Sequence, residues 1–216
     1  MLHQFEALFA LMLAQFQPLP HWIYLTEYKT DEIKKKAQLF ADRDYGAVSN
    51  GSSDSQAGFV MHAVYPGVDP STANQQTWNE SVSDIGWLIE EGAKRYLANP
   101  EYNAYKHGLR VLPGSMTLMV GIGSGKELKP VMNMASSVTY LERETAEEGI
   151  GFAEVTKEVK AEDAYQWILA MSSLAEMIKN VRLAGFRQTP IQISTVKIDR
   201  IGLTRLKPVS TFRMSL

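Results

Sequence analysis

The chain has 216 residues, which is long for one domain and short for two, and it contains no cysteine. The lack of cysteine excludes disulfide scaffolds, zinc–thiolate sites, iron–sulfur clusters and cysteine nucleophiles, and it permits a cytoplasmic location. A formal net charge of −2 provides no general attraction to nucleic acid or to an anionic membrane.

The amino-terminal segment, residues 1–16, has the pattern of an amphipathic helix. Its apolar residues recur at helical spacing: Phe5, Leu8, Phe9, Met12 and Phe16. The segment is too short to span a bilayer and no later segment is apolar enough, so we expect no membrane partner. The apolar side of this helix is expected to dock on the core or on a partner.

A second helix is predicted to begin at Thr30 or Asp31, either of which can cap it, and to end at Gly46. Its buried stripe is expected to consist of Ile33, Ala37 and Phe40. Residues 49–58 form a polar, low-complexity run, which predicts a mobile loop with little buried surface.

Residues 58–67 are expected to form a short strand that ends at Pro66 and Gly67. A long helix is predicted from about Asn74 to Ala98. Its apolar residues keep a helical period: Trp78, Val82, Ile85, Ile89 and Tyr96. The first half of the chain is therefore predicted to be mainly helical.

After Gly108 the apolar period changes toward two, which is typical of strands. Three strands are predicted, at residues 115–122, 131–143 and 150–159. A further helix follows from Glu162 to about Ala184, and alternating residues then predict a last strand at 191–206.

This order of elements predicts the α+β class, with a helical amino-terminal half followed by an antiparallel sheet with one long packed helix. We expect one domain over residues 1–216. A division into a mainly helical part, 1–113, and a sheet with a helix, 114–216, is the alternative.

Charge is unevenly distributed in the second half. Residues 141–163 are mainly acidic, and the segment from Arg182 onward is mainly basic. One interpretation is a pair of solvated faces that complement each other in the fold, and the other is a phosphate-binding surface.

Residues 120–130, VGIGSGKELKP, match a phosphate-binding loop only in part. That loop requires GxxxxGK[S/T], whereas Val120 occupies its first glycine position and Glu127 its hydroxyl position. A carboxylate at the hydroxyl position repels phosphate, so we predict a flexible connection between strands.

Residues 99–108, NPEYNAYKHG, have the start and stop signals of a short helix. On this helix Asn103 and His107 share one face, Lys106 lies beside them, and Arg110 follows the end. These groups can bind phosphate or carboxylate, with His107 as proton donor or acceptor and Lys106 as a substrate-binding residue. The structural alternative is a buried pair of Asn103 and His107 that fixes how two helices meet.

Other kinds of site find no support in the sequence. None of the four histidines lies three or four residues from another, so we expect no metal site. No GxSxG motif and no complete cofactor motif occur, so we expect neither a serine hydrolase nor a bound cofactor.

The pattern YNxxKHG, Tyr102 to Gly108, and the long helix before it resemble the terminal helices of HEPN-type proteins. These are helical modules of bacterial defence and toxin systems, and some of them cut RNA. The resemblance covers residues 74–110 and implies an RNA or nucleotide partner and metal-independent cleavage. Asn103 and His107 match the polar residue and the histidine of the family's catalytic pattern. Tyr102 stands where the family has arginine, and the sheet-rich second half departs from an all-helical module.

The sequence leaves two functions open. The leading hypothesis is a non-catalytic binding or assembly protein of a bacterial or phage system, which uses the amino-terminal helix and the sheet to contact a protein partner or a second copy. The alternative is a metal-independent ribonuclease or nucleotide-binding protein centred on Asn103, His107 and Arg110.

Overall fold

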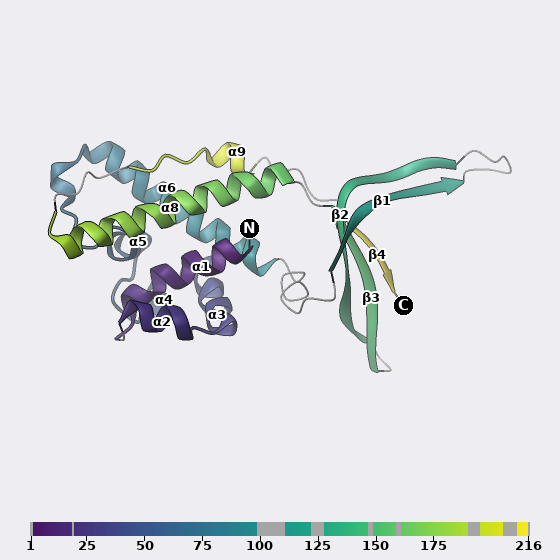
Figure 1. The fold of residues 1–216 in the computed structure, drawn as a ribbon, viewed down its shortest axis with the longest axis horizontal. Coiled ribbons are helices and arrows are strands. Elements are labelled where there is room, and N and C mark those ends of the chain that lie inside the picture. Colours follow the sequence, from purple (N-terminus) through teal and green to yellow (C-terminus); the bar gives the residue numbers. More distant parts are fainter. Residues whose placement is uncertain are drawn as a thin grey trace. The chain divides into compact units, whose positions relative to one another are not determined.

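A computed structural model gives the fold as two compact units (Figure 1). The helical unit comprises Met1–Asn99 and Ala164–Arg205, and the sheet unit comprises Pro100–Asp163 and Leu206–Leu216. The structure describes residues 2–18, 20–98, 111–121, 128–146, 149–158, 161–189, 195–204 and 211–215. Helices and an antiparallel sheet in separate units confirm the α+β class.

The helical unit is built from short helices around two long ones. The short elements are α1 (Leu2–Leu13), η1 (Ala14–Phe16), α2 (His21–Glu27), α3 (Thr30–Ala41), α4 (Tyr45–Val48), α5 (Gln56–Val64), η2 (Pro70–Thr72) and α9 (Arg200–Thr204). The long helices are α6 (Gln75–Leu97) and α8 (Ala161–Arg187). Helix α8 belongs to the helical unit from Ala164 onward.

Helix α1 docks its apolar side on the core of the helical unit. Phe5 and Phe9 are fully buried, and their rings lie 5.6 Å from Trp167 and 5.4 Å from Phe40 between centroids. The prediction of an amphipathic helix is confirmed. Because its apolar side is covered by the chain itself, this side does not offer a surface to a partner.

Helix α3 buries Ile33, Ala37 and Phe40, as predicted, but it ends at Ala41 rather than at Gly46. The residue that stops the helix is Arg43, whose φ of 62° lies in the left-handed region. The predicted end was wrong because a glycine is the usual but not the required residue for this conformation.

Helix α5 replaces both the end of the predicted loop and the predicted strand at 58–67. The Ser55 side chain caps this helix by accepting a hydrogen bond from the backbone N–H of Gly58 at 3.1 Å. A short apolar run such as Phe59–Val64 fits a strand and a buried helix equally, which explains the wrong prediction. The polar run also buries more than expected, because Ser49 is fully buried and its Oγ bonds the backbone of Ser53.

Helices α6 and α8 confirm the two strongest predicted helices, and they lie side by side in Figure 1. The Tyr65 hydroxyl lies 3.2 Å from Ser81 Oγ of α6 and 3.5 Å from Met177 Sδ of α8. Farther along, Trp87 of α6 stacks on Trp167 of α8 at 6.1 Å between centroids. The residue numbers rise along one helix as they fall along the other, so α6 and α8 run antiparallel. The buried side of α8 packs on helices α1 and α6.

The sheet unit is a four-stranded antiparallel meander in the order β1-β2-β3-β4. The strands are β1 (Val111–Gly121), β2 (Leu128–Ala146), β3 (Gly149–Glu158) and β4 (Thr211–Ser215). The three predicted strands are confirmed, whereas β4 was not predicted. Tyr140 and Val155 lie opposite each other across β2 and β3, and both are buried. The flexible connection was predicted over residues 120–130: residues 120–121 and 128–130 belong to β1 and β2, and residues 122–127 lie outside the described residues.

The predicted strand at 191–206 is wrong for the part that the structure describes. Residues 195–199 have no regular secondary structure; they lie on helix α6 and lead into α9. The N–H groups of Val196 and Ile198 bond Ser81 Oγ at 2.8 Å and Asp84 Oδ2 at 2.9 Å. Side chains of a helix thus take the place of a neighbouring strand, which explains the strand-like alternation.

Candidate functional site

The residues nominated from the sequence, Asn103, Lys106, His107 and Arg110, lie outside the described part of the chain. The structure therefore neither brings them together nor separates them. Their assignment as a site, and the alternative of a buried Asn103 and His107 pair, stay predictions.

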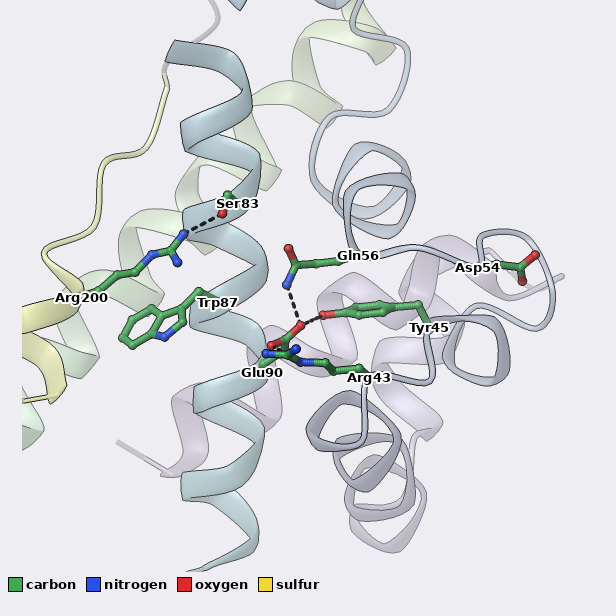
Figure 2. Close-up of a pocket in the computed structure, with 8 residues that line it drawn as sticks. All are labelled: Arg43, Tyr45, Asp54, Gln56, Ser83, Trp87, Glu90 and Arg200. Carbon is green, nitrogen blue, oxygen red and sulfur yellow. Dashed lines mark hydrogen bonds and ion pairs between the residues drawn. The ribbon is translucent and has the colours of Figure 1, made fainter. Parts of the chain in front are cut away.

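A different candidate lies in the helical unit, where a pocket of about 490 Å³ opens beside α6 (Figure 2). This volume falls within the usual range for small-ligand sites. The pocket is lined by Arg43, Tyr45, Asp54, Gln56, Ser83, Trp87, Glu90 and Arg200. These residues come from the turn after α3, the starts of α4, α5 and α9, and three positions of α6.

Glu90 is the buried centre of one wall, with only 3% of its surface exposed. Its Oε1 accepts hydrogen bonds from the Tyr45 hydroxyl and from Gln56 Nε2, both at 2.6 Å. Its Oε2 accepts a charge-assisted bond from Arg43 Nε at 3.0 Å. A buried carboxylate requires such donors, so these bonds fix the positions of all three partners.

Local structure places these donors around Glu90. The left-handed conformation of Arg43 ends α3 and turns its side chain toward α6. Asp44 caps α4 by accepting from the backbone N–H of Ala47 at 3.0 Å, so Tyr45 starts a helix beside the carboxylate.

Glycine is required at one position of this wall. A side chain at residue 86 would overlap the Gln56 side chain. Gly86, one turn of α6 before Glu90, therefore gives Gln56 the space to reach the carboxylate.

The second wall consists of Arg200 and Trp87, which Figure 2 shows to the left of α6, with Glu90 to the right. Arg200 Nε lies 2.6 Å from Asp84 Oδ1, and its terminal nitrogen donates to Ser83 Oγ at 2.8 Å. The guanidinium carbon of Arg200 lies 5.7 Å from the centroid of the Trp87 ring.

Behind Trp87, the ring of Trp167 is stacked at 6.1 Å, and the guanidinium carbon of Arg95 lies 4.7 Å from the centroid of Trp167. Arg95 and Trp87 therefore both contact the Trp167 ring, and Arg200 contacts Trp87. Both rings are held in place by their neighbours, so the second wall is preorganised.

The electrostatics of the pocket favour binding over proton transfer. Burial, together with the hydrogen bond and charge of Glu90, raises the pKa of Tyr45 well above its ordinary value of 10.0. Tyr45 therefore remains a protonated donor at neutral pH. The lining carries two arginines and two acids, Asp54 and Glu90, and Figure 2 shows Asp54 well apart from Glu90.

This site was not predicted from the sequence, because its residues have no common spacing. Arg43, Gln56, Glu90 and Arg200 come from four distant segments. One signal was present in the sequence: Glu90 directly follows the apolar residue Ile89 in the buried stripe of α6. A carboxylate at such a position is rarely buried without partners.

Comparison of the chain with protein-family models, with curated proteins and with solved structures found no match. Within the described ranges, no group of three or more histidines and carboxylates is arranged to hold a metal ion. Of the helices in the same ranges, none has both the length and the hydropathy needed to cross a membrane.

Proposed function

We propose that the protein is a non-catalytic binding protein of the cytoplasm, and that the pocket beside Glu90 takes a small ligand with a phosphate or carboxylate group. The observation that carries this proposal is the way in which Glu90 holds Arg43. Glu90 binds the Nε of Arg43, while 71% of the Arg43 side chain is exposed.

Arg43 supplies the anion-binding group of this proposal. Among the described residues its Nε bonds Glu90, which leaves the two terminal nitrogens for a ligand. A guanidinium fixed at one edge loses little conformational entropy when the other edge binds an anion. Phosphate and carboxylate both match the fork of a guanidinium.

The wall of Arg200 and Trp87 favours a planar group in the same ligand. Guanidinium and indole are both flat and stack on aromatic rings. A mononucleotide combines a phosphate with such a ring, so AMP is a suitable probe. Inorganic phosphate and citrate test the two anionic groups without a ring.

We propose a binding protein rather than an enzyme because Tyr45, Gln56 and Glu90 are hydrogen-bonded to one another. Tyr45 and Gln56 both donate to Glu90, and the raised pKa of Tyr45 opposes its ionisation. A general base or nucleophile requires a group that is poised to exchange a proton near neutral pH.

The test is a titration of tryptophan fluorescence with AMP, inorganic phosphate and citrate. We expect a saturable change with AMP and a weaker one with the two anions alone. The variant Arg43→Gln should lose the response, and Lys34→Gln, which removes an exposed cation of α3, should keep it. Equal titrations for Arg43→Gln and the parent contradict the proposal, and so does no response to any of the three probes.

The alternative function is a metal-independent ribonuclease or nucleotide-binding protein related to HEPN proteins, centred on Asn103, His107 and Arg110. Helix α6, which precedes these residues and begins at the cap residue Asn74, supports it. Incubation with mixed RNA in EDTA tests this function. Cleavage by the parent and none by His107→Ala, with equal melting temperatures, is the expected result for an enzyme.

A further inference from the structure

The side-chain amide of Gln56 has a fixed orientation in the pocket beside Glu90. Its Nε2 donates a hydrogen bond to Glu90 Oε1 at 2.6 Å. An ionised carboxylate can only accept hydrogen bonds, so the nitrogen of the amide has to face Glu90 and the oxygen has to face away from it. Figure 2 shows the Gln56 oxygen on the side of the amide away from Glu90.

The same amide lies on helix α6 at Gly86. A Cβ at residue 86 would overlap the carbon of the amide and would lie 2.6 Å from its oxygen. Along α6, Ser83 comes three residues before Gly86 and Glu90 comes four residues after it. The amide nitrogen is bound at Glu90, so the oxygen points along the helix toward the end that carries Ser83 (Figure 2).

The oxygen of the Gln56 amide is open to the pocket. Among the described residues, no group donates a hydrogen bond to this Oε1. It is also not one of the fully enclosed polar atoms of these residues that lack a partner, so it reaches solvent. Gln56 therefore presents to a ligand an acceptor whose direction is set before binding.

Ser83 provides a donor on the side toward which this oxygen points. Its Oγ accepts a hydrogen bond from a terminal nitrogen of Arg200 at 2.8 Å. A hydroxyl that accepts one hydrogen bond still has its own hydrogen to donate. Gln56 and Ser83 line the same pocket as Trp87, which directly follows Gly86 on the helix. An acceptor and a donor thus accompany the aromatic ring.

We propose that the ligand is a nucleotide of adenine or cytosine, whose amino group donates to Gln56 Oε1 and whose neighbouring ring nitrogen accepts from Ser83 Oγ. This inference rests on the proposed function, in which Arg43 binds the phosphate and Trp87 stacks on the ring. Adenine and cytosine both place an amino donor next to a ring nitrogen acceptor. Hypoxanthine and uracil have a carbonyl oxygen and an N–H group at these positions, which sets acceptor against acceptor and donor against donor.

The environment of the two groups sets the size of the expected preference. A site built to hydrogen-bond a polar group of its ligand rejects the analogue that lacks the group, because the site's own groups stay unpaired. Ser83 is exposed and Gln56 is half-buried, so water replaces part of what is lost. We therefore expect AMP to bind on the order of tenfold more tightly than IMP. CMP should be preferred over UMP in the same way.

Titration calorimetry of the parent with AMP, IMP, CMP and UMP measures this preference without a tryptophan signal. All four nucleotides carry the same phosphate, so binding through Arg43 alone gives them similar affinities. Equal affinities for AMP and IMP, both lost in Arg43→Gln, overturn the inference about the base and leave the proposed function in place. No saturable heat with any of the four at two temperatures overturns both.

The variant Gly86→Ala tests the position of the amide without removing it. The added methyl group displaces the flexible end of the Gln56 side chain from α6, whereas alanine suits the interior of a helix better than glycine does. We expect the preference for AMP over IMP to fall below about threefold, while both nucleotides still bind through Arg43.

Gly185→Ala is the matched control, because it makes the same change in α8 where a Cβ meets no neighbour within 4 Å. It should keep the preference of the parent. Gln56→Met, which keeps the length of the side chain but has no amide, should lose the preference as Gly86→Ala does. Melting curves confirm that the variants are folded. A preference for AMP that persists in Gly86→Ala or in Gln56→Met overturns the inference.

Discussion

Glu90 and Asp84 lie on the same helix, and each holds an arginine that lines the pocket. The Glu90 side chain is 4% exposed and binds Arg43 from the turn after α3. The Asp84 side chain is 14% exposed and binds Arg200 at the start of α9. Within the described part of the chain, the donors to Glu90 are all side chains, whereas Asp84 also accepts a backbone N–H.

The difference between these two acids lies in what each one joins. Glu90 ties three segments of the helical unit to α6, and loss of its carboxylate leaves Tyr45 without an acceptor in the core. Asp84 fastens one segment, residues 195–204, to the outside of the helix. The same pairing of an acid and an arginine therefore supports the core in one place and a surface attachment in the other.

The largest expected effect comes from Glu90→Ala. We expect the free energy of unfolding to fall by roughly 3 kcal/mol, because a buried hydroxyl loses its partner and a cavity replaces the carboxylate. Chemical denaturation of parent and variant measures this change. A loss no greater than that of Asp84→Ala contradicts the distinction between the two acids.

Tyr45→Phe should have a smaller effect, a loss of roughly 1–2 kcal/mol at neutral pH, because one hydrogen bond to Glu90 disappears. The pH dependence sharpens this prediction. The folded protein raises the pKa of Tyr45 above its ordinary value of 10.0, so the unfolded chain releases the proton first as pH rises.

Stability linked to Tyr45 is therefore complete below about pH 10 and declines as pH rises above it. Denaturation curves across this range should fall less steeply for Tyr45→Phe than for the parent. Tyr96, whose pKa burial also raises, contributes equally to both proteins and cancels in the comparison. Parallel curves contradict the role of Tyr45 in this pH dependence.

Asp84→Ala should give the smallest change in global stability, about 1 kcal/mol or less, because the Arg200 pair lies near the surface. Its local effect is larger. Hydrogen exchange of Ile198 should become faster, because its N–H loses the acceptor Asp84 Oδ2. Exchange of Val196, which bonds Ser81 Oγ in the same segment, should also become faster when the segment is no longer fastened at Asp84. Glu90→Ala should leave this exchange unchanged relative to the folded fraction.

The elements that the sequence predicted well are those whose apolar pattern is long. Helices α6 and α8 carry a complete buried stripe over many turns, and β2 and β3 alternate along their length. The failures have particular causes. Phe59–Val64 is a short apolar run that fits either structure, and residues 195–199 alternate because they bond a helix.

The pocket could not be predicted from the sequence, and the reason is a different one. Arg43 and Glu90 meet only because Arg43 adopts a conformation that the sequence does not indicate. Arg200 reaches the pocket only because the chain returns along α6 after α8. Contacts between segments this distant follow from the packing of the whole unit, and local sequence patterns do not indicate them.

The position of β4 in the chain has a consequence for synthesis on the ribosome. Strands β1, β2 and β3 leave the ribosome before α8. The second neighbour of β3, strand β4 (Thr211–Ser215), leaves it only after α8. Until then the outer edge of β3 has backbone groups without a neighbouring strand. The nascent sheet therefore passes through a stage in which this edge can pair wrongly, and its completion has to await the translation of the last strand.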